Sequence, residues 1–447
     1  MDDLIRVENE LNQAISAGDL VHASRLLDDL SPREVTEVIE RSPQSKAAVT
    51  YRLLAKGRAL EVFEFLDPAV QGDLVHALRD DEVASLFQEL DPDDRAQLID
   101  EVPAVVAQRL IQGLNPKDRV ITNAILGYRS GSVGRRMSPE YVHAHPDETV
   151  EATMVRVQQK AKDAETIYTL PVTDSAKRLV GIVSLREVIA SEPGTLISEL
   201  MSEAEHALAT DSAEGAARTC ADHEYLLLPI VDSETRLLGI LTIDDAHQIL
   251  RDAEAEDVAR AGGSEPLRRP YLSTSVFSIA RSRVVWLLVL AVSALLTVQV
   301  LEVFEATLEQ KVVLALFIPL LTGTGGNTGS QAATTITRAL AVGDVRTSDV
   351  WLVLFREIRV GAMLGLLLGS LGFVLASLVY DVPTGTVIGL TLLCVCAMAA
   401  TVGGAMPLIA KTIRVDPAVF STPFITTFCD ATGLLIYFTI AKTVLGI

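Results

Sequence analysis

One carboxylate inside a long apolar stretch offers the clearest chemistry in this sequence. Residues 420–440 form an apolar span in which Asp430, near the middle, is the one charged residue. The nearest cations along the chain, Arg414 and Lys442, lie outside the stretch. A charge at bilayer depth costs about 2.5–3.5 kcal/mol, so such an acid usually faces a cavity, an ion or a partner subunit. We therefore expect Asp430 to bind a cation. A structural aspartate hydrogen-bonded between helices is the alternative.

Oxygen donors accompany this carboxylate. Thr426 and Gly433 lie one turn on either side of it, and Asn327 belongs to a Gly- and Thr-rich run, residues 322–331, in another apolar stretch. Residues 260–447 contain no histidine and no paired cysteines, which disfavours zinc or copper. Oxygen ligands suit Mg²⁺, and also Mn²⁺, Co²⁺ or Ca²⁺. One carboxylate cannot strip a Mg²⁺ ion of its water, but two symmetry-related copies could hold a hydrated one.

The apolar stretches are long enough to cross a bilayer, which takes about 20 residues. We place five of them at 284–304, 312–337, 360–380, 387–409 and 420–440. Arginines and lysines gather before the first stretch, between the second and third, and between the fourth and fifth. The positive-inside rule then predicts a multi-pass protein of the inner (plasma) membrane, with a cytosolic N-terminus and an external C-terminus.

The charges divide the chain into two parts. Residues 1–259 hold 48 of the 58 acids but only 25 of the 38 bases. The first part is thus strongly acidic, which argues against nucleic acid as a partner, because phosphates call for a basic face. It has no apolar N-terminal run of the kind found in a secretory signal, so we expect it in the cytosol.

A repeat organises residues 1–130. Proline recurs at positions 32, 68, 92 and 116, each time directly after Ser, Asp or Asn. This pairing is typical of an N-cap followed by proline at the first helical position. Because a short amphipathic helix pair cannot bury its apolar face alone, we expect a stacked helical solenoid.

A second repeat, of 58 residues, fills residues 131–250. Leu170–Asp174 followed by Leu179–Ser184 recurs as Leu228–Asp232 followed by Leu237–Thr242, and a helix is expected after each. This order of strand, turn, strand and helix resembles a tandem CBS pair. Such pairs commonly bind adenosine nucleotides through a Gly-x-x-Ser/Thr-x-x-Asp run, which Gly239–Asp245 matches. Thr242 and Asp245 are therefore candidate ATP-binding residues, and a nucleotide-free regulatory scaffold is the alternative.

Residues 251–275 predict a charged helix, 251–260, followed by a linker with two glycines. Four carboxylates within six residues repel one another unless a cation or a basic partner screens them. This connecting helix is either simply solvated or controlled by divalent cations.

The chain as a whole resembles the MgtE family of magnesium channels and transporters. The order of helical N-domain (1–130), CBS pair (131–250), connecting helix (251–275) and five-helix membrane domain (276–447) matches from end to end. The matching motifs are Pro270–Thr274, Gly326–Gln331, Asp416–Ala418, Thr422–Pro423 and Asp430–Tyr437.

The resemblance implies a homodimer with a central pore lined by the second and fifth spans. Asp430 then occupies the position of the pore-selectivity aspartate, with Thr426, Gly433 and Asn327 beside it. The resemblance also implies that regulatory Mg²⁺ bound by cytosolic acids closes the pore. The candidate ligands in this sequence are Asp91, Glu224, Asp245, Glu256 and Asp257.

Two other classes of function stay open. An intramembrane aspartyl protease needs two carboxylates sharing one site. The five predicted spans contain only Asp430 at depth, since Glu302 lies at the end of the first span, so we do not expect an enzyme. A membrane-anchored nucleotide sensor without transport activity would not need the polar Gly-Asn run of the second span.

Overall fold

The computed structural model describes residues 2–267, 269–413 and 422–446. It contains two compact units. The first comprises Met1–Ala253 with Leu267–Ser275, and the second comprises Glu254–Pro266 with Val276–Ile447. The predicted motif Asp416–Ala418 and the first two residues of the predicted span 420–440 lie outside the described residues.

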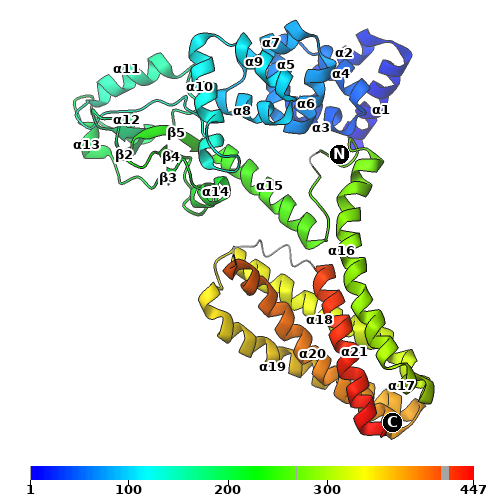
Figure 1. Ribbon diagram of the computed structural model, residues 1–447. Coiled ribbons are helices and arrows are strands. Elements are labelled where there is room, and N and C mark those ends of the chain that lie inside the picture. Colours follow the sequence, from blue (N-terminus) through cyan, green and yellow to red (C-terminus); the bar gives the residue numbers. More distant parts are fainter. Residues whose placement is uncertain (1, 268, 414–421, 447) are drawn as a thin grey trace. The chain divides into compact units, whose positions relative to one another are not determined.

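Short helices make up the N-terminal part of the first unit (Figure 1). They pack mostly against the next helix but one, α3 on α5, α4 on α6, α6 on α8 and α8 on α10, and their shared core includes Leu27, Phe63 and Phe87. This stacking confirms the predicted helical architecture. The helices are α1 (Asp2–Ala17), α2 (Leu20–Asp28), α3 (Pro32–Arg41), α4 (Gln44–Arg52), α5 (Lys56–Phe65), α6 (Pro68–Ala77), α7 (Asp80–Glu89), α8 (Pro92–Glu101), α9 (Ala104–Gly113) and α10 (Pro116–Leu126).

The proline repeat marks helix starts as predicted. Pro32, Pro68, Pro92 and Pro116 each begin a helix. The preceding side chain accepts a backbone N–H at three of the four starts, and Asp91, before Pro92, is the exception.

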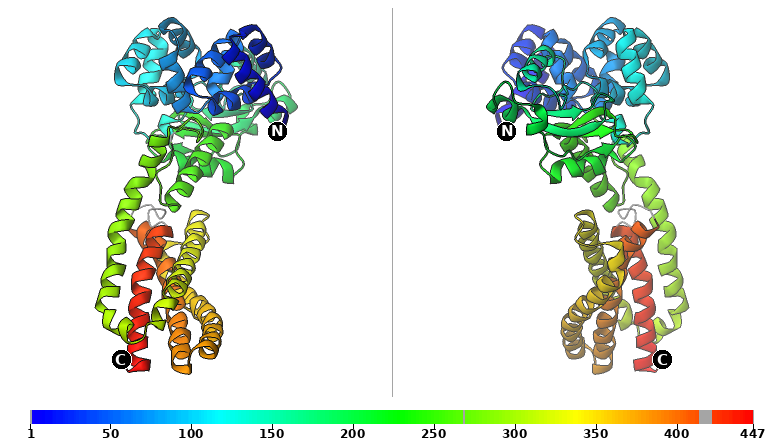
Figure 2. Two further views of the ribbon diagram at one scale, coloured as in Figure 1. Left: turned by 90° about the vertical axis from the view of Figure 1, so that its right-hand side faces the viewer. Right: turned by 90° about the vertical axis from the view of Figure 1, so that its left-hand side faces the viewer.

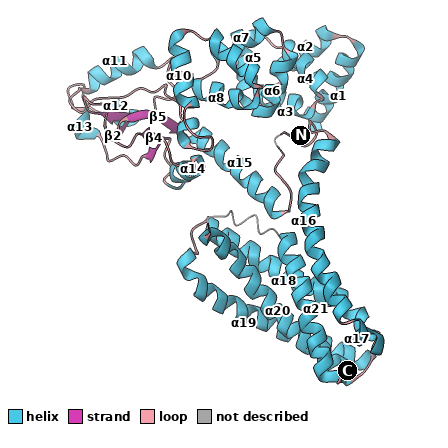
Figure 3. Cartoon of the chain, in the orientation of Figure 1, coloured by secondary structure: helices cyan, strands magenta, loops and turns pink. Residues whose placement is uncertain are grey.

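The strands are confined to the CBS-like part of the first unit (Figure 3). Strands β1 and β2 are antiparallel and pair Pro171 with Ile182, while β4 and β5 pair Pro229 with Ile240 in the same way, 58 residues later. Strand β3 is parallel to β4. The elements are η1 (Val133–Arg135), α11 (Val150–Lys160), β1 (Thr169–Thr173), β2 (Leu179–Ser184), α12 (Leu185–Ala190), α13 (Ile197–Leu200), β3 (Ala207–Leu208), α14 (Ala213–Asp222), β4 (Leu227–Val231) and β5 (Leu237–Thr242).

The two CBS-like halves exchange their leading segments. Ser138, ahead of the first half, pairs with Ile240 of the second, and Ser202, ahead of the second, pairs with Ile182 of the first. Gly181 makes this approach possible, because a Cβ there would lie 2.7 Å from the Ser202 carbonyl oxygen. The exchange binds the halves into one body.

Helix α15 (Ile243–Ala261) joins two elements that the sequence suggested separately. The helix after β5 and the charged connecting helix form one uninterrupted helix of 19 residues. It ends near Gly263, which has a φ of +67°, a conformation that glycine adopts readily.

Besides the end of α15, the second unit contains five long helices and the short α17 and η2 in the part of the chain that the structure describes (Figure 2). They are α16 (Val276–Val303), α17 (Glu305–Gln310), α18 (Val313–Ala341), η2 (Thr347–Asp349), α19 (Val350–Val379), α20 (Val382–Thr412) and α21 (Thr422–Leu445). Among the described residues, four stretches are long and apolar enough to cross a membrane: Val276–Val303, Thr347–Val379, Val382–Thr412 and Pro423–Leu445. Helix α18 is as long but carries the Gly- and Thr-rich run, which lowers its hydropathy.

Small residues bring the helices of the second unit together. Helix α18 packs on α20 and α21, and α19 packs on α20. Gly365 and Gly369 of α19 face the backbone of α20, where a Cβ would lie 2.6–2.7 Å from the nearest atom. Small residues let membrane helices approach closely, so this unit depends on its glycines.

Candidate metal centres

Three carboxylates of the first unit converge on one point. An oxygen from each of Glu64 on α5, Asp91 before α8 and Asp94 on α8 lies within 4.8 Å of the other two. It is the one group of three potential metal ligands found among the described residues. Asp91 can take part because its side chain makes no capping hydrogen bond at the start of α8.

A buried acid lies beside this trio. The side chain of Asp93 is only 4% exposed, and its Oδ1 has no hydrogen-bond partner among the described residues. Asp245 of α15 and Glu165 are close enough to repel its charge. Thr242 donates a 2.7 Å hydrogen bond to Asp245, and Ser138 donates one of 3.2 Å to Glu165. The predicted ligands Asp91 and Asp245 therefore share one acidic region.

Burial and mutual repulsion disfavour the charged form of these groups. Burial, with help from Asp91, raises the pKa of Glu64 to about 7. Burial, Asp245 and Glu64 raise the pKa of Asp94 to about 8. Burial and Asp91 raise the pKa of Glu165 to about 7. An opposite charge at this place would reverse these shifts.

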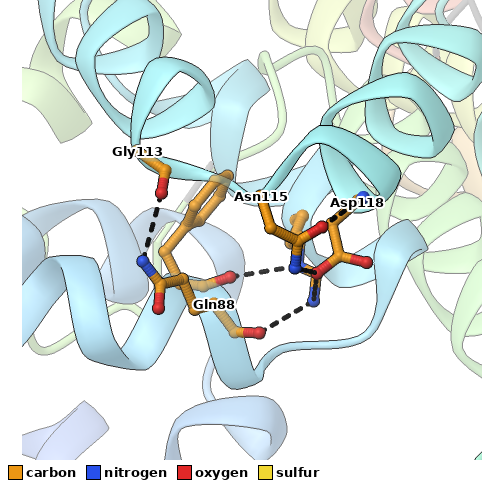
Figure 4. Close-up of polar contacts among 6 residues, drawn as sticks. Gln88, Gly113, Asn115 and Asp118 are labelled. Atoms are coloured by element: carbon orange, nitrogen blue, oxygen red, sulfur yellow. Dashed lines mark hydrogen bonds and ion pairs between the residues drawn. The ribbon is translucent and has the colours of Figure 1, made fainter.

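Two arginines close to the acidic region hold their guanidinium groups partly through other residues. Arg95, next to Asp94 in sequence, donates from Nε to the Phe87 carbonyl at 3.0 Å and from Nη2 to the Gln88 carbonyl at 2.9 Å. The side-chain amide of Gln88 in turn donates to the Gly113 carbonyl, and the side-chain amide of Asn115 donates to the Asp118 carboxylate, in the network that Figure 4 shows. Arg136 pairs with Asp252 at 3.3 Å. Burial still raises the pKa of Asp91 and of Asp245, although Arg95 opposes the rise for Asp91 and Arg136 opposes it for Asp245. An external cation would add to this partial compensation.

Hard oxygen donors fit a divalent cation such as Mg²⁺. The converging trio and the unpartnered oxygen of Asp93 both favour an ion at this place. We refer to Glu64, Asp91, Asp93, Asp94 and Asp245 as the N–CBS acid cluster.

The other predicted cytosolic ligands lie outside the trio. Glu224 follows α14 with a φ of +55°. Glu256 forms an ion pair with Arg260 on α15, and Asp257 follows it on the same helix. The first unit contains Glu224, and the second contains Glu256 and Asp257.

The predicted nucleotide residues have a counterpart 58 residues earlier. Ser184 donates to Glu187 at 2.7 Å, just as Thr242 donates to Asp245. Glu187 is exposed, whereas Asp245 is half-buried among like charges.

In the second unit, α18 meets α21 through polar and small side chains. The hydroxyl oxygens of Ser330 and Thr426 lie 3.3 Å apart, and the methyl group of Thr426 lies against Gly326. Residues four apart occupy the same face of a helix, so Asp430 lies one turn beyond Thr426 on α21.

Asp430 is half-buried, and its Oδ1 is buried without a hydrogen-bond partner among the described residues. No basic side chain within that part of the chain forms an ion pair with it. Gly433 is buried near Val395 of α20, while Asn327 of α18 is exposed. The structure thus places Thr426 and Asp430 along one stripe and leaves Asn327 on an open face of α18.

Sequence reasoning missed Glu64, Asp93, Asp94 and Glu165. The acids in Asp91-Pro92-Asp93-Asp94 were a local signal, because three acids at a helix start exceed what capping needs. Glu64 and Glu165 carry no such signal, since only the tertiary fold brings them to α8.

Comparisons with known proteins agree with this architecture. Residues 30–131 match the MgtE intracellular N domain, residues 131–193 the CBS domain, and residues 318–440 the divalent cation transporter domain named MgtE. The chain is 34% identical to the magnesium transporter MgtE of Thermus thermophilus, over 97% of this chain and 98% of that one. It is 33% identical to the magnesium transporter MgtE of Enterococcus faecalis, over 71% and 70%.

The first unit also resembles a solved structure. The crystal structure of the cytosolic domain of the Mg²⁺ channel MgtE in complex with ATP aligns with a TM-score of 0.51 and 31% identity. It covers 54% of this chain and 99% of its own.

A helical N-domain, a CBS pair and apolar membrane helices define a divalent-cation transport protein with large domains outside its membrane helices. The match over nearly the full length then identifies the family. This chain belongs to the MgtE family of magnesium transporters.

Proposed function

We propose that two copies of this chain form a homodimeric channel that carries Mg²⁺ into the cell across the plasma membrane. The main support for this proposal is the buried Oδ1 of Asp430 on α21, which has no hydrogen-bond partner among the described residues and lies next to the contact with α18. Two such carboxylates facing each other supply two negative charges, enough to attract a Mg²⁺ ion that keeps most of its waters. Thr426, Gly433 and Asn327 add neutral oxygens. The relatives' names support Mg²⁺ as the cargo.

The same ion is proposed to regulate the channel. Mg²⁺ held by Glu64, Asp91 and Asp94, with Asp245 adjacent, would neutralise acids contributed by both the N-terminal helices and the CBS pair. That neutralisation favours the closed arrangement of the first unit. Glu256 and Asp257 of α15, and Glu224, are proposed as further regulatory ligands.

ATP is the proposed second ligand, bound at the CBS pair. The structure of a relative's cytosolic domain was determined in complex with ATP, which supports this proposal. Thr242 and Asp245 match the ribose-binding pattern, and Ser184 with Glu187 repeats their geometry in a more exposed place. The acids around Asp245 repel the negative charge of a triphosphate. This repulsion favours ATP binding at the more exposed pair, Ser184 and Glu187.

Flux of Mg²⁺ into liposomes tests the proposed pore. Asp430→Asn keeps the shape of the side chain and removes its charge, so we expect Mg²⁺ uptake to be abolished while the dimer stays intact. Asp381→Asn is the matched control, because this acid pairs with Lys311 at an interhelical connection. Normal Mg²⁺ uptake by Asp430→Asn would show that the Asp430 carboxylate is not needed in the pore.

Ion competition in the same liposomes tests the cargo. We expect Mg²⁺ to be preferred over Mn²⁺, Co²⁺ and Ca²⁺, and an imposed voltage to drive the flux without a proton gradient. Preferential uptake of Ca²⁺ or Mn²⁺ would replace Mg²⁺ as the cargo, and a strict need for the proton gradient would replace a channel by a coupled transporter.

A further inference from the structure

Helix α19 is longer than a bilayer core is thick. Its 30 residues span about 45 Å at about 1.5 Å per residue, against a hydrocarbon core of about 30 Å. The stretch from Val360 to Val379, which carries no charged residue, alone accounts for about 30 Å. The first ten residues of the helix therefore extend into the headgroup layer of one leaflet.

Those ten residues carry aromatic and basic side chains on an outward face. Trp351, Phe355 and Arg359 are spaced four residues apart and so share one face of the helix. Trp351 is 80% exposed and Phe355 is 63% exposed. Arg356 is exposed beside them. Tryptophan is enriched at the membrane–water interface.

The guanidinium of Arg359 is held in a fixed orientation. It lies 4.8 Å from the centre of the Phe355 ring, and its Nε donates a 3.0 Å hydrogen bond to the Phe355 carbonyl. Neither Arg356 nor Arg359 forms an ion pair with any residue that the structure describes. The two Nη groups of Arg359 are left to bind an acceptor, and two oxygens of a phosphate match such a pair.

We propose that Trp351, Phe355, Arg356 and Arg359 form a binding site for the phosphate of an anionic phospholipid headgroup. Arg359 binds the phosphate, Arg356 adds a second positive charge, and the two aromatic rings contact the glycerol and upper acyl-chain region. The position of the site at the end of the apolar stretch favours a lipid over a soluble phosphate, because only a lipid places its phosphate and acyl chain at this depth.

The sequence offers a built-in reporter, since it contains only two tryptophans, Trp286 and Trp351. The full-length Trp286→Phe variant leaves Trp351 as the single tryptophan. We would reconstitute it in vesicles of phosphatidylcholine that contain equal fractions of acyl-brominated phosphatidylglycerol or acyl-brominated phosphatidylcholine. A charge-assisted contact corresponds to at least about tenfold preference, so we expect brominated phosphatidylglycerol to quench Trp351 fluorescence at about tenfold lower mole fraction.

Two variants in the same background locate the site. Arg359→Gln should abolish the preference for phosphatidylglycerol. Arg283→Gln is the matched control, because it removes an exposed arginine near the start of α16 and should leave the preference unchanged. Equal quenching by both lipids in the parent, or retained preference in Arg359→Gln, would overturn the proposal. Equal loss in both variants would show general surface attraction and would also overturn it.

Two further measurements cover other outcomes. Inorganic phosphate added to the vesicles should not relieve the quenching, and relief would show that the site takes soluble anions instead. Native mass spectrometry of the chain with both tryptophans present should show phosphatidylglycerol retained by the parent and lost from Arg359→Gln, which keeps the test valid if Trp286→Phe misfolds. Retention by both proteins would overturn the proposal.

Discussion

Gly403 of α20 lies directly against the carbonyl oxygen of Gly329 of α18, so that a Cβ on Gly403 would overlap that oxygen. This contact sets how closely the Gly-rich run approaches its neighbour. Since Gly329 also touches Ile425 and Cys429 of α21, the two glycines fix the position of α18 relative to the helix that carries Asp430.

We predict that Gly403→Ala destabilises the membrane unit by about 1–3 kcal/mol, the usual range for overpacking. Gly323→Ala is the control, because a Cβ there meets nothing within 4 Å and alanine favours a helix. Thermal unfolding of the purified full chain in detergent measures both. Equal melting temperatures for Gly403→Ala and the parent would show that α18 and α20 can move apart freely.

A buried hydroxyl on α21 forms a hydrogen bond to the start of α18. Tyr437 is fully buried, and its hydroxyl donates to the Leu314 carbonyl at 2.9 Å. Tyr437→Phe should lower stability by about 1 kcal/mol, the net contribution of one such bond. Tyr271→Phe, at an exposed tyrosine, should change it by less than about 0.5 kcal/mol. The same unfolding assay checks both values.

The N–CBS acid cluster should make local stability depend on pH and Mg²⁺. Its carboxyls have a raised pKa, about 7 for Glu64 and about 8 for Asp94, so the folded state binds more protons than the unfolded state between about pH 4.5 and pH 8. Without divalent cations, stability should therefore fall as the pH rises through this window. Hydrogen–deuterium exchange at α8, corrected for the intrinsic pH dependence of exchange, measures this change in local stability.

Mg²⁺ should restore protection of α8 mainly at pH 8, because protonated carboxyls do not bind the ion. At 100 times the dissociation constant, binding adds about 2.7 kcal/mol. The double variant Glu64→Gln with Asp94→Asn should lose the response to Mg²⁺ and weaken the pH dependence, which Glu165 and the remaining acids of the cluster retain in part. A response that persists in this variant would place the regulatory ion elsewhere.

Neutralising the connecting helix should separate conduction from closure. We expect Glu256→Gln with Asp257→Asn to keep Mg²⁺ uptake but to stay open at cytosolic Mg²⁺ concentrations that close the parent. Glu214→Gln is the control, because Glu214 also pairs with an arginine four residues on, but on α14. Patch-clamp recording with Mg²⁺ on the cytosolic face is the measurement. Closure that is unchanged in the double variant would remove α15 from the proposed regulation.

Local patterns predicted the element types well. Proline at positions 32, 68, 92 and 116 marked four helix starts, since the first turn of a helix accommodates proline without losing a hydrogen bond. The 58-residue repeat predicted β1–β2 and β4–β5 in equivalent register. These features depend on neighbours in the sequence. The predicted domain limits, the membrane orientation and the dimer stay predictions.

Long-range partners could not be predicted in the same way. Nothing in the segment around Ser138 shows that it pairs with the second CBS-like half, because exchange depends on how the two halves pack. Helix α19 begins at Val350 rather than near residue 360, since hydropathy detects the apolar core and not the helix that extends beyond it. Glu64 reaches Asp91 only through the stacking of helices.

Helix α15 runs without a break from Ala253, in one unit, to Glu254, in the other. Its 19 residues span about 28 Å at about 1.5 Å per residue. A tilt of about 5° at its CBS end would move its acidic tip by about 2 Å, roughly the reach of one metal–oxygen bond. The backbone turns just beyond the helix at Gly263, which has a φ of +67°. A residue with a Cβ at this position should therefore strain the turn and change the direction in which the chain leaves α15.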